Sequence, residues 1–144
     1  MPVVGEVITV KIPVPHAFNY LSEPENLAEF WPNLSDINYV DSLPDDKEGY
    51  EWKYKFAGIS LHGLAEITGV VPNKLLIIET RGDIYSILTW SFSHTDEGTR
   101  VSCIFNYEAP GLNLNEQTKE VLVKRIERQI SRLMSNLRDK FSEY

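Results

Sequence analysis

The chain contains three histidines and one cysteine, and their spacing does not form a familiar catalytic set. His62 and Glu66 share one face of a predicted strand, but roughly 13 Å separates positions four apart on a strand, too far to share a metal ion. Cys103 has no cationic neighbour in the sequence, which favours a small core residue over a nucleophile. The chain also lacks a nucleotide-binding loop, a zinc signature and a nucleophile elbow. We therefore predict no catalytic residue, no metal and no cofactor.

Aromatic residues offer the clearest chemical pattern, because they alternate along three segments of the chain. One face of residues 50–57 carries Tyr50, Trp52, Tyr54 and Phe56. The same alternation continues in two later segments, at Leu88, Trp90 and Phe92 and then at Val101, Cys103, Phe105 and Tyr107. Apolar walls with a few phenol and indole donors suit a hydrophobic or aromatic ligand that carries one or two polar atoms. The alternative is that the same rings only fill the core of a small domain.

A long amphipathic helix is predicted for the C-terminal part of the chain. Its apolar residues recur at steps of three and four: Leu122, Ile126, Ile130, Leu133, Leu137 and Phe141. Asn113 followed by Glu116 is the expected cap. A helix over residues 116–141 would be roughly 39 Å long at about 1.5 Å per residue, which is close to the full width of a domain of this size. An equally long surface must cover its apolar stripe.

An antiparallel sheet is the expected partner of that helix. A first strand is predicted over residues 3–12, and two short helices follow, one over residues 15–21 and one that Ser22 and Glu25 cap and Trp31 ends. From Asp36 onward the period is 2, with strands predicted at 36–43, 50–57, 60–71, 75–82, 84–93 and 99–109. Short Gly-, Pro-, Asn- and Asp-containing turns separate them, which favours a meander of antiparallel neighbours. The predicted class is α+β.

This order of elements resembles the helix-grip fold of the START-like (SRPBCC) superfamily, which includes polyketide cyclase/dehydrase-type and lipid-transfer proteins. The resemblance covers the whole chain and rests on short segments in the expected order: residues 10–21, 24–27, 31–34, 98–101 and 107–111. It implies one domain over residues 1–144, with about seven strands in a curved antiparallel sheet wrapped on the C-terminal helix. Within the superfamily the chain looks most similar to the branch of carbon-monoxide-dehydrogenase accessory proteins. The glycine-rich loop of the related plant pollen allergens is absent, because residues 45–49 contain a single glycine.

The resemblance and the aromatic face together predict a ligand cavity between the sheet and the helix. The residues expected to line it are Trp52, Tyr54, Phe56, Leu88, Trp90, Cys103, Phe105, Tyr107, Ile126, Ile130 and Met134, with Phe30 and Trp31 at the rim. Our first hypothesis is a binding or carrier module for a hydrophobic small molecule such as a lipid, an isoprenoid quinone or a polyketide-like compound. The second is a cyclase or dehydratase that uses the same cavity. A normal tyrosine pKa near 10 makes Tyr54 and Tyr107 poor bases, which favours the first hypothesis.

Charge and composition narrow the remaining classes. The net charge is −7, which disfavours nucleic-acid binding because contacts with phosphate need positive charge. The outer face of the long helix is nevertheless basic, with Lys124, Arg125, Arg128 and Arg132. This face is either a solvated surface or, as a third hypothesis, the docking surface of an accessory protein. The single cysteine, the lack of an export signal and the lack of a long apolar run predict a cytoplasmic protein without a membrane span. The sequence does not indicate an oligomeric state.

Overall fold

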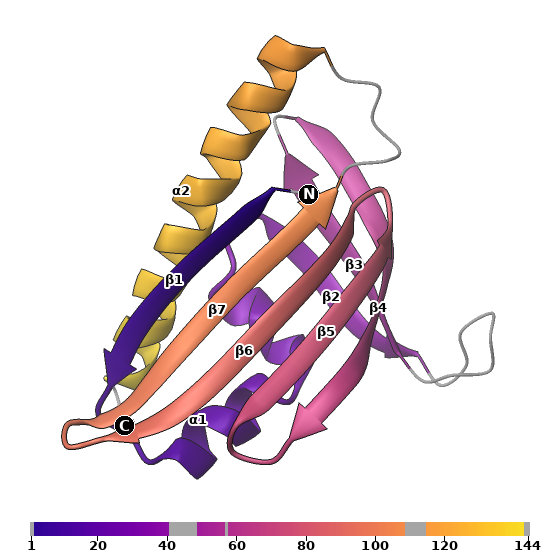
Figure 1. Ribbon diagram of the computed structural model, residues 1–144. Coiled ribbons are helices and arrows are strands. Elements are labelled where there is room, and N and C mark those ends of the chain that lie inside the picture. The colour runs from indigo at the N-terminus through magenta and orange to yellow at the C-terminus, as the bar shows by residue number, and fades with distance from the viewer. Residues whose placement is uncertain (1, 41–48, 57, 109–114, 143–144) are drawn as a thin grey trace.

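Seven antiparallel strands form one curved sheet in the computed structural model, which describes residues 2–40, 49–56, 58–108 and 115–142. The elements follow the chain as β1 (Val3–Val10), α1 (Val14–Leu21), η1 (Pro24–Glu29), β2 (Leu34–Val40), β3 (Gly49–Phe56), β4 (Ile59–Val71), β5 (Leu75–Gly82), β6 (Tyr85–Thr95), β7 (Gly98–Glu108) and α2 (Glu116–Phe141). The order across the sheet is β1-β7-β6-β5-β4-β3-β2. The predicted α+β class and meander are confirmed, since β2 to β7 pair in sequence and β7 then pairs with β1 (Figure 1).

The strands alternate between a buried and an exposed face, as the period-2 pattern predicts. On β7, Val101, Cys103, Phe105 and Tyr107 are buried, while the residues between them are more exposed. The first strand is shorter than predicted, because it ends at Val10 while the prediction ran to residue 12. The second strand begins two residues before the predicted start, at Leu34, directly after Asn33 turns the chain with a φ of 66°.

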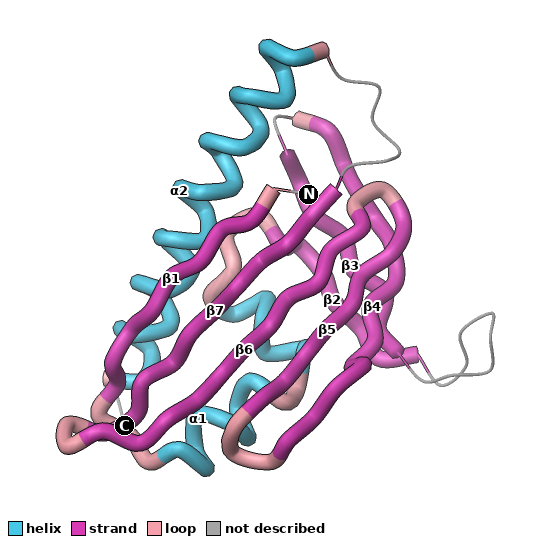
Figure 2. Tube along the Cα trace, viewed as in Figure 1, coloured by secondary structure: helices cyan, strands magenta, loops and turns pink. Residues whose placement is uncertain are grey.

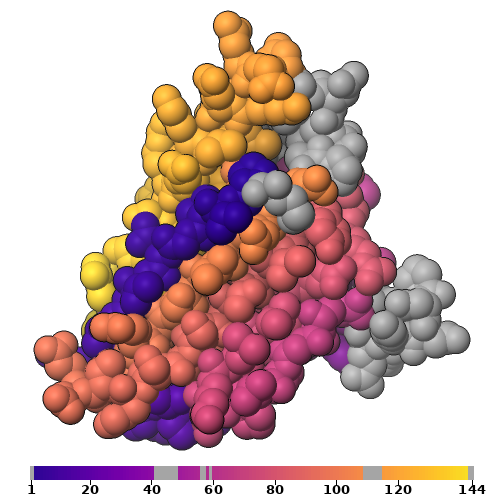
Figure 3. Space-filling view, viewed as in Figure 1, coloured from indigo at the N-terminus to yellow at the C-terminus, as the bar shows by residue number. Residues whose placement is uncertain are grey.

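The helix α2 buries its predicted stripe against the concave side of the sheet and runs alongside β1 (Figures 1 and 2). Its cap differs from the prediction. The side chain of Asn115 accepts a hydrogen bond of 2.8 Å from the backbone N–H of Thr118. Because the helix begins at Glu116, the capping position is the residue directly before it, and Asn113 lies outside the described residues. In the space-filling view the outer face of β7, β6 and β5 is in front, and α2 is visible beside β1 (Figure 3).

The two short helices close one end of the sheet, and they are tied to the end of α2. The predicted cap of the second helix by Ser22 is wrong, because Ser22 Oγ donates a hydrogen bond of 2.6 Å to the Phe18 carbonyl and so satisfies the end of α1. Lys140 Nζ lies 2.6 Å from Glu29 Oε2. Asn136 Nδ2 donates to the Phe30 carbonyl at 3.0 Å. Contacts far apart in sequence therefore fix α2 over the inner face of the sheet.

Candidate ligand-binding cavity

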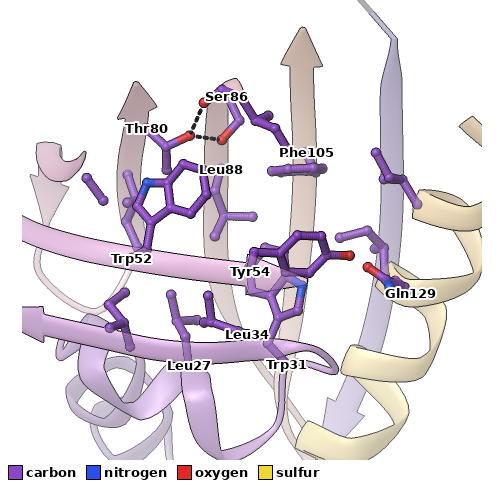
Figure 4. Close-up of a pocket in the computed structure, with 16 residues that line it drawn as sticks. Leu27, Trp31, Leu34, Trp52, Tyr54, Thr80, Ser86, Leu88, Phe105 and Gln129 are labelled. Atoms are coloured by element: carbon purple, nitrogen blue, oxygen red, sulfur yellow. Dashed lines mark hydrogen bonds between the residues drawn. The ribbon is translucent and has the colours of Figure 1, made fainter. Parts of the chain in front are cut away.

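A cavity lies between the concave face of the sheet and α2, with about 90 Å³ open to the centres of water-sized atoms. Strands β2 to β7 form most of its wall, η1 and Trp31 close one side, and α2 closes another (Figure 4). Most of the wall is aliphatic or aromatic. The lining residues are Leu27, Trp31, Leu34, Ile37, Trp52, Tyr54, Ala65, Ile78, Thr80, Ile84, Ser86, Leu88, Phe105, Ile126, Gln129 and Ile130.

The structure brings together many of the residues that the sequence suggested for a cavity. They come from four elements and one connecting segment: Trp52 and Tyr54 on β3, Leu88 on β6, Phe105 on β7, Ile126 and Ile130 on α2, and Trp31 after η1. The ring of Trp31 packs edge-on against Phe105, with 5.8 Å between the ring centroids. Contact of these side chains with a ligand is a proposal that we take up below.

Five of the suggested residues are buried but do not line the cavity: Phe30, Trp90, Cys103, Tyr107 and Met134. Their inward direction follows from the alternation, but a period of 2 does not say how far along a strand a cavity extends. Towards the end that α1 and η1 cover, other side chains fill the space, as where Phe30 packs edge-on against Trp90 at 6.5 Å. The side chain of Phe56 lies outside the part of the chain that the structure describes.

Two polar residues of the wall, Thr80 and Ser86, were not among the residues singled out from the sequence. They are cross-strand partners on β5 and β6, and their hydroxyl oxygens lie 2.5 Å apart in a hydrogen bond. Thr80 Oγ1 also donates to the Ile84 carbonyl at 3.4 Å. Alternation with Ile78 and with Leu88 places both hydroxyls on the inner face, so the signal was present in the sequence. An emphasis on aromatic residues missed it.

Gln129 was missed for a similar reason, because a polar residue interrupts the apolar stripe of α2. It lies one position before Ile130 and three after Ile126, and both of these neighbours line the cavity. In Figure 4 the Gln129 amide and the Tyr54 hydroxyl lie at the same side of the cavity, away from Thr80 and Ser86. The cavity therefore has an apolar middle and polar groups at two separate places.

Burial controls the titration of the inner-face residues. It raises the pKa of Tyr54 to about 12, although the nearby positive charge of Arg125 works in the opposite direction. Burial also raises the pKa of Tyr107, and the negative charge of Glu127 adds to the effect. The pKa of the Cys103 thiol is raised far above its usual range, mainly by burial and further by Glu6. Both phenols and the thiol are thus protonated at neutral pH.

Three buried polar hydrogens have no hydrogen-bond partner among the described residues: those on Trp52 Nε1, Trp90 Nε1 and the Tyr107 hydroxyl. Of these three residues, only Trp52 lines the cavity. An unpaired donor in an apolar interior costs free energy, because the group has lost its hydrogen bonds to water. The N–H of Trp52 is therefore a place where a bound molecule could gain a hydrogen bond.

Other groups that the sequence brought into question lie outside the cavity wall. The exposed His62 side chain approaches Asp83, with 3.9 Å between Nε2 and Oδ2. Arg81 pairs with Glu66 at 3.0 Å and with Glu79 at 3.5 Å. Within the described residues, no three His, Cys, Asp or Glu side chains gather in a way that could hold a metal ion. None of the helices in this part of the chain is both long enough and apolar enough to cross a bilayer.

A sheet that curves around one long helix and encloses an apolar cavity defines a START-like helix-grip protein. The chain belongs to the family described as polyketide cyclase / dehydrase and lipid transport, whose model matches residues 1–142. The predicted superfamily is thereby confirmed. The narrower carbon-monoxide-dehydrogenase accessory branch stays a prediction.

Solved structures share this fold at low sequence identity. TTHA0849 from Thermus thermophilus superposes with a TM-score of 0.82 at 17% identity, over 99% of this chain and 98% of that chain. The Zhui aromatase/cyclase from Streptomyces sp. R1128 gives 0.75 at 12% identity, over 98% and 93% of the two chains. A START superfamily protein from Mycobacterium smegmatis gives 0.73 at 11% identity, over 96% and 97%. No curated protein matches this chain.

Proposed function

We propose that this protein binds a hydrophobic small molecule in the cavity between the sheet and α2 and acts as its carrier. The observation that carries this proposal is the cavity itself, whose middle is walled by aliphatic and aromatic side chains such as Leu88, Phe105 and Ile130. The family description supports it, since lipids and polyketides are both largely apolar. A lipid, an isoprenoid quinone or a polyketide-like compound fits this description. The cytoplasmic location expected from the sequence is part of the same proposal.

An empty cavity of this kind weakens the fold, which supports a bound ligand over a space kept vacant. At about 24 cal/mol per Å³, the free-energy cost of about 90 Å³ is about 2 kcal/mol. Apolar cavities stay dry and take up apolar molecules, because water cannot replace its lost hydrogen bonds there. A ligand would regain the missing contacts with Leu88, Phe105 and Ile130.

The titratable groups of the wall favour binding over the cyclase or dehydratase alternative. Among the described residues that line the cavity, Tyr54 alone carries a titratable side chain. With a pKa of about 12, Tyr54 is protonated at neutral pH, so it can donate a hydrogen bond but is a poor acceptor of a proton. General base catalysis needs a group whose pKa lies closer to the working pH.

The third hypothesis, an accessory protein that docks through its basic helix face, gains no specific support. Lys124, Arg125, Arg128 and Arg132 are exposed on α2, as a solvated helix face would be. We therefore propose the carrier function alone.

A fluorescence titration tests this function. N-phenyl-1-naphthylamine is uncharged and brightens in apolar surroundings, so it should bind saturably to the native protein with one site per chain. Ala65→Leu adds three carbon atoms to a buried residue of the wall and should weaken this binding at least about tenfold, because the space is then occupied. The matched control Val70→Leu enlarges an exposed residue on the same strand and should change nothing. Saturable binding that Ala65→Leu leaves unchanged, or no binding at all, would contradict the proposal.

A further inference from the structure

One end of the cavity combines three polar side chains on neighbouring strands: Trp52 on β3, Thr80 on β5 and Ser86 on β6. The register of the sheet places Ala65, Thr80 and Ser86 in one row across β4, β5 and β6. Trp52 belongs to the next row, opposite Gly63. Figure 4 shows the indole nitrogen of Trp52 on the side of its ring that faces Thr80. We name Trp52, Thr80 and Ser86 the polar end of the cavity.

The two hydroxyls of the polar end can satisfy each other, but the indole N–H is left over. Ser86 can donate to Thr80 Oγ1, which in turn donates to the Ile84 carbonyl, so both hydroxyl hydrogens are used. Trp52 Nε1 has no partner among the described residues, and Trp52 is 7% exposed. An indole nitrogen can donate a hydrogen bond but cannot accept one. The unmet need at this end is therefore for an acceptor.

The charge of the wall sets the second requirement. The described residues that line the cavity include no Asp, Glu, Lys, Arg or His. A carboxylate or phosphate placed among Trp52, Leu88 and Phe105 would lose its hydration without gaining a counter-ion, which is costly in an apolar interior. A neutral oxygen loses far less, and a ketone, ester or quinone carbonyl accepts hydrogen bonds well.

We propose that the polar end is a recognition subsite for a neutral hydrogen-bond-accepting oxygen on an otherwise apolar ligand, with the Trp52 indole N–H as its donor. This inference rests on the proposed function and names the chemistry of the ligand: a carbonyl-bearing apolar molecule, as opposed to a pure hydrocarbon or an anionic lipid head group. The remaining lone pairs of Thr80 and Ser86 allow a hydroxyl next to the carbonyl to bind as well.

Nuclear magnetic resonance of the indole groups tests the subsite directly, because the chain has three tryptophans and so three indole N–H signals. Substitutions of each tryptophan by phenylalanine assign these signals. The ligands are a matched pair, acetophenone and α-methylstyrene, which differ in a carbonyl oxygen replaced by a CH₂ group. Acetophenone should shift the Trp52 indole proton downfield, as a new hydrogen bond does, and α-methylstyrene should not. The Trp90 signal should stay in place with both, because Trp90 lies outside the wall.

Affinity measurements on two variants complete the test. Trp52→Phe keeps an aromatic ring but removes the N–H, so the affinity for acetophenone relative to α-methylstyrene should fall about three- to tenfold, the usual value of one hydrogen bond. Trp90→Phe removes an equally buried and unpaired N–H that does not line the cavity, and it should leave this ratio unchanged.

The ways in which this test can fail are distinguishable. If both ligands bind but the Trp52 signal does not shift and the ratio survives in Trp52→Phe, the subsite is wrong while the carrier function stands. If neither ligand binds to the native protein, the subsite and the proposed function are both contradicted. The shift of the Trp52 signal is read on the native protein, so a poorly folded variant does not affect it.

Discussion

The indole ring of Trp52 packs directly on the backbone of Gly63, its cross-strand partner on β4. A Cβ atom built on Gly63 would lie 2.6 Å from Cζ2 of the ring, closer than real side chains approach. The same Cβ would also clash with the backbone carbonyl of Arg81 on β5. A glycine is therefore needed here so that the ring can lie flat on the sheet and form part of the cavity wall.

Gly63→Ala should destabilise the protein, because the added methyl group forces both the Trp52 ring and strand β5 to move. We expect a loss of roughly 1–3 kcal/mol in the free energy of unfolding, measured by urea denaturation. The control is Gly5→Ala on β1, where the nearest atom to the new Cβ is 3.9 Å away, and its effect should stay within about 0.5 kcal/mol. Equal stability of the two variants would refute the close-packing argument.

Ile130→Ala should cost less stability than Leu137→Ala, although both residues are buried on the same face of α2. Ile130 lines the cavity and so has fewer packed neighbours to lose, whereas Leu137 does not line it. Leu137→Ala should fall within the roughly 2–5 kcal/mol usual for a core residue, and Ile130→Ala should lie at least about 1 kcal/mol lower. Urea denaturation gives both values. A cost at Ile130 as large as that at Leu137 would indicate a filled core in place of a cavity.

Tyr54→Phe should change how stability depends on pH in the alkaline range. Burial raises the pKa of Tyr54 from 10.0 to about 12 in the folded protein, so the folded state holds this proton more tightly than the unfolded chain does. The stabilisation is complete below pH 10 and is lost as the pH rises towards 12. In the variant, the fall in the free energy of unfolding over this range should be shallower. Coincident curves for the variant and the parent would show that Tyr54 is not buried as described.

Glu29→Gln tests the link between η1 and the end of α2. The carboxylate of Glu29 pairs with Lys140 and accepts a hydrogen bond of 2.9 Å from the Tyr20 hydroxyl, and these two contacts lower its pKa below 4.5. Its stabilisation is therefore present above about pH 4.5 and is lost as the pH falls through the lowered pKa. Because the side chain is 45% exposed, we expect a cost below about 1 kcal/mol at pH 7.

The control for this link is Glu25→Gln, which changes an exposed residue of the same short helix. This variant should have the stability of the parent at pH 7. The loss in Glu29→Gln should shrink when denaturation is repeated at pH 3, where the parent carboxylate is increasingly protonated. A loss of the same size at pH 7 and pH 3 would mean that charge pairing is not its cause.

Most of the fold could be predicted from the sequence, because it depends on patterns that act over short distances. The period of 2 on β7 and the steps of three and four on α2 each identify a buried face without knowledge of its partner. The caps were less predictable. Several polar residues near a helix end can serve as caps, and the choice of Asn115 depends on where the first turn starts.

The candidate site was less predictable, because it depends on where packing is incomplete. Trp90 and Leu88 alternate on the same face of β6, yet only Leu88 borders the cavity. Which of them meets empty space depends on the α1 and η1 side chains packed against that end of the sheet. The polar pair of Thr80 and Ser86 shows the opposite error, since residues that look exposed by type are part of the inner wall.

The most direct test of the carrier function is to locate a bound apolar molecule inside the protein. Nuclear Overhauser contacts from N-phenyl-1-naphthylamine to assigned methyl groups provide this location. We expect contacts to the buried methyl groups of Ile78, Ile126 and Ile130, which line the cavity, and none to those of Val70 and Val121, which are exposed. Contacts confined to the exposed valines, or no contacts with any methyl group under saturating probe, would contradict the binding of an apolar ligand between the sheet and α2.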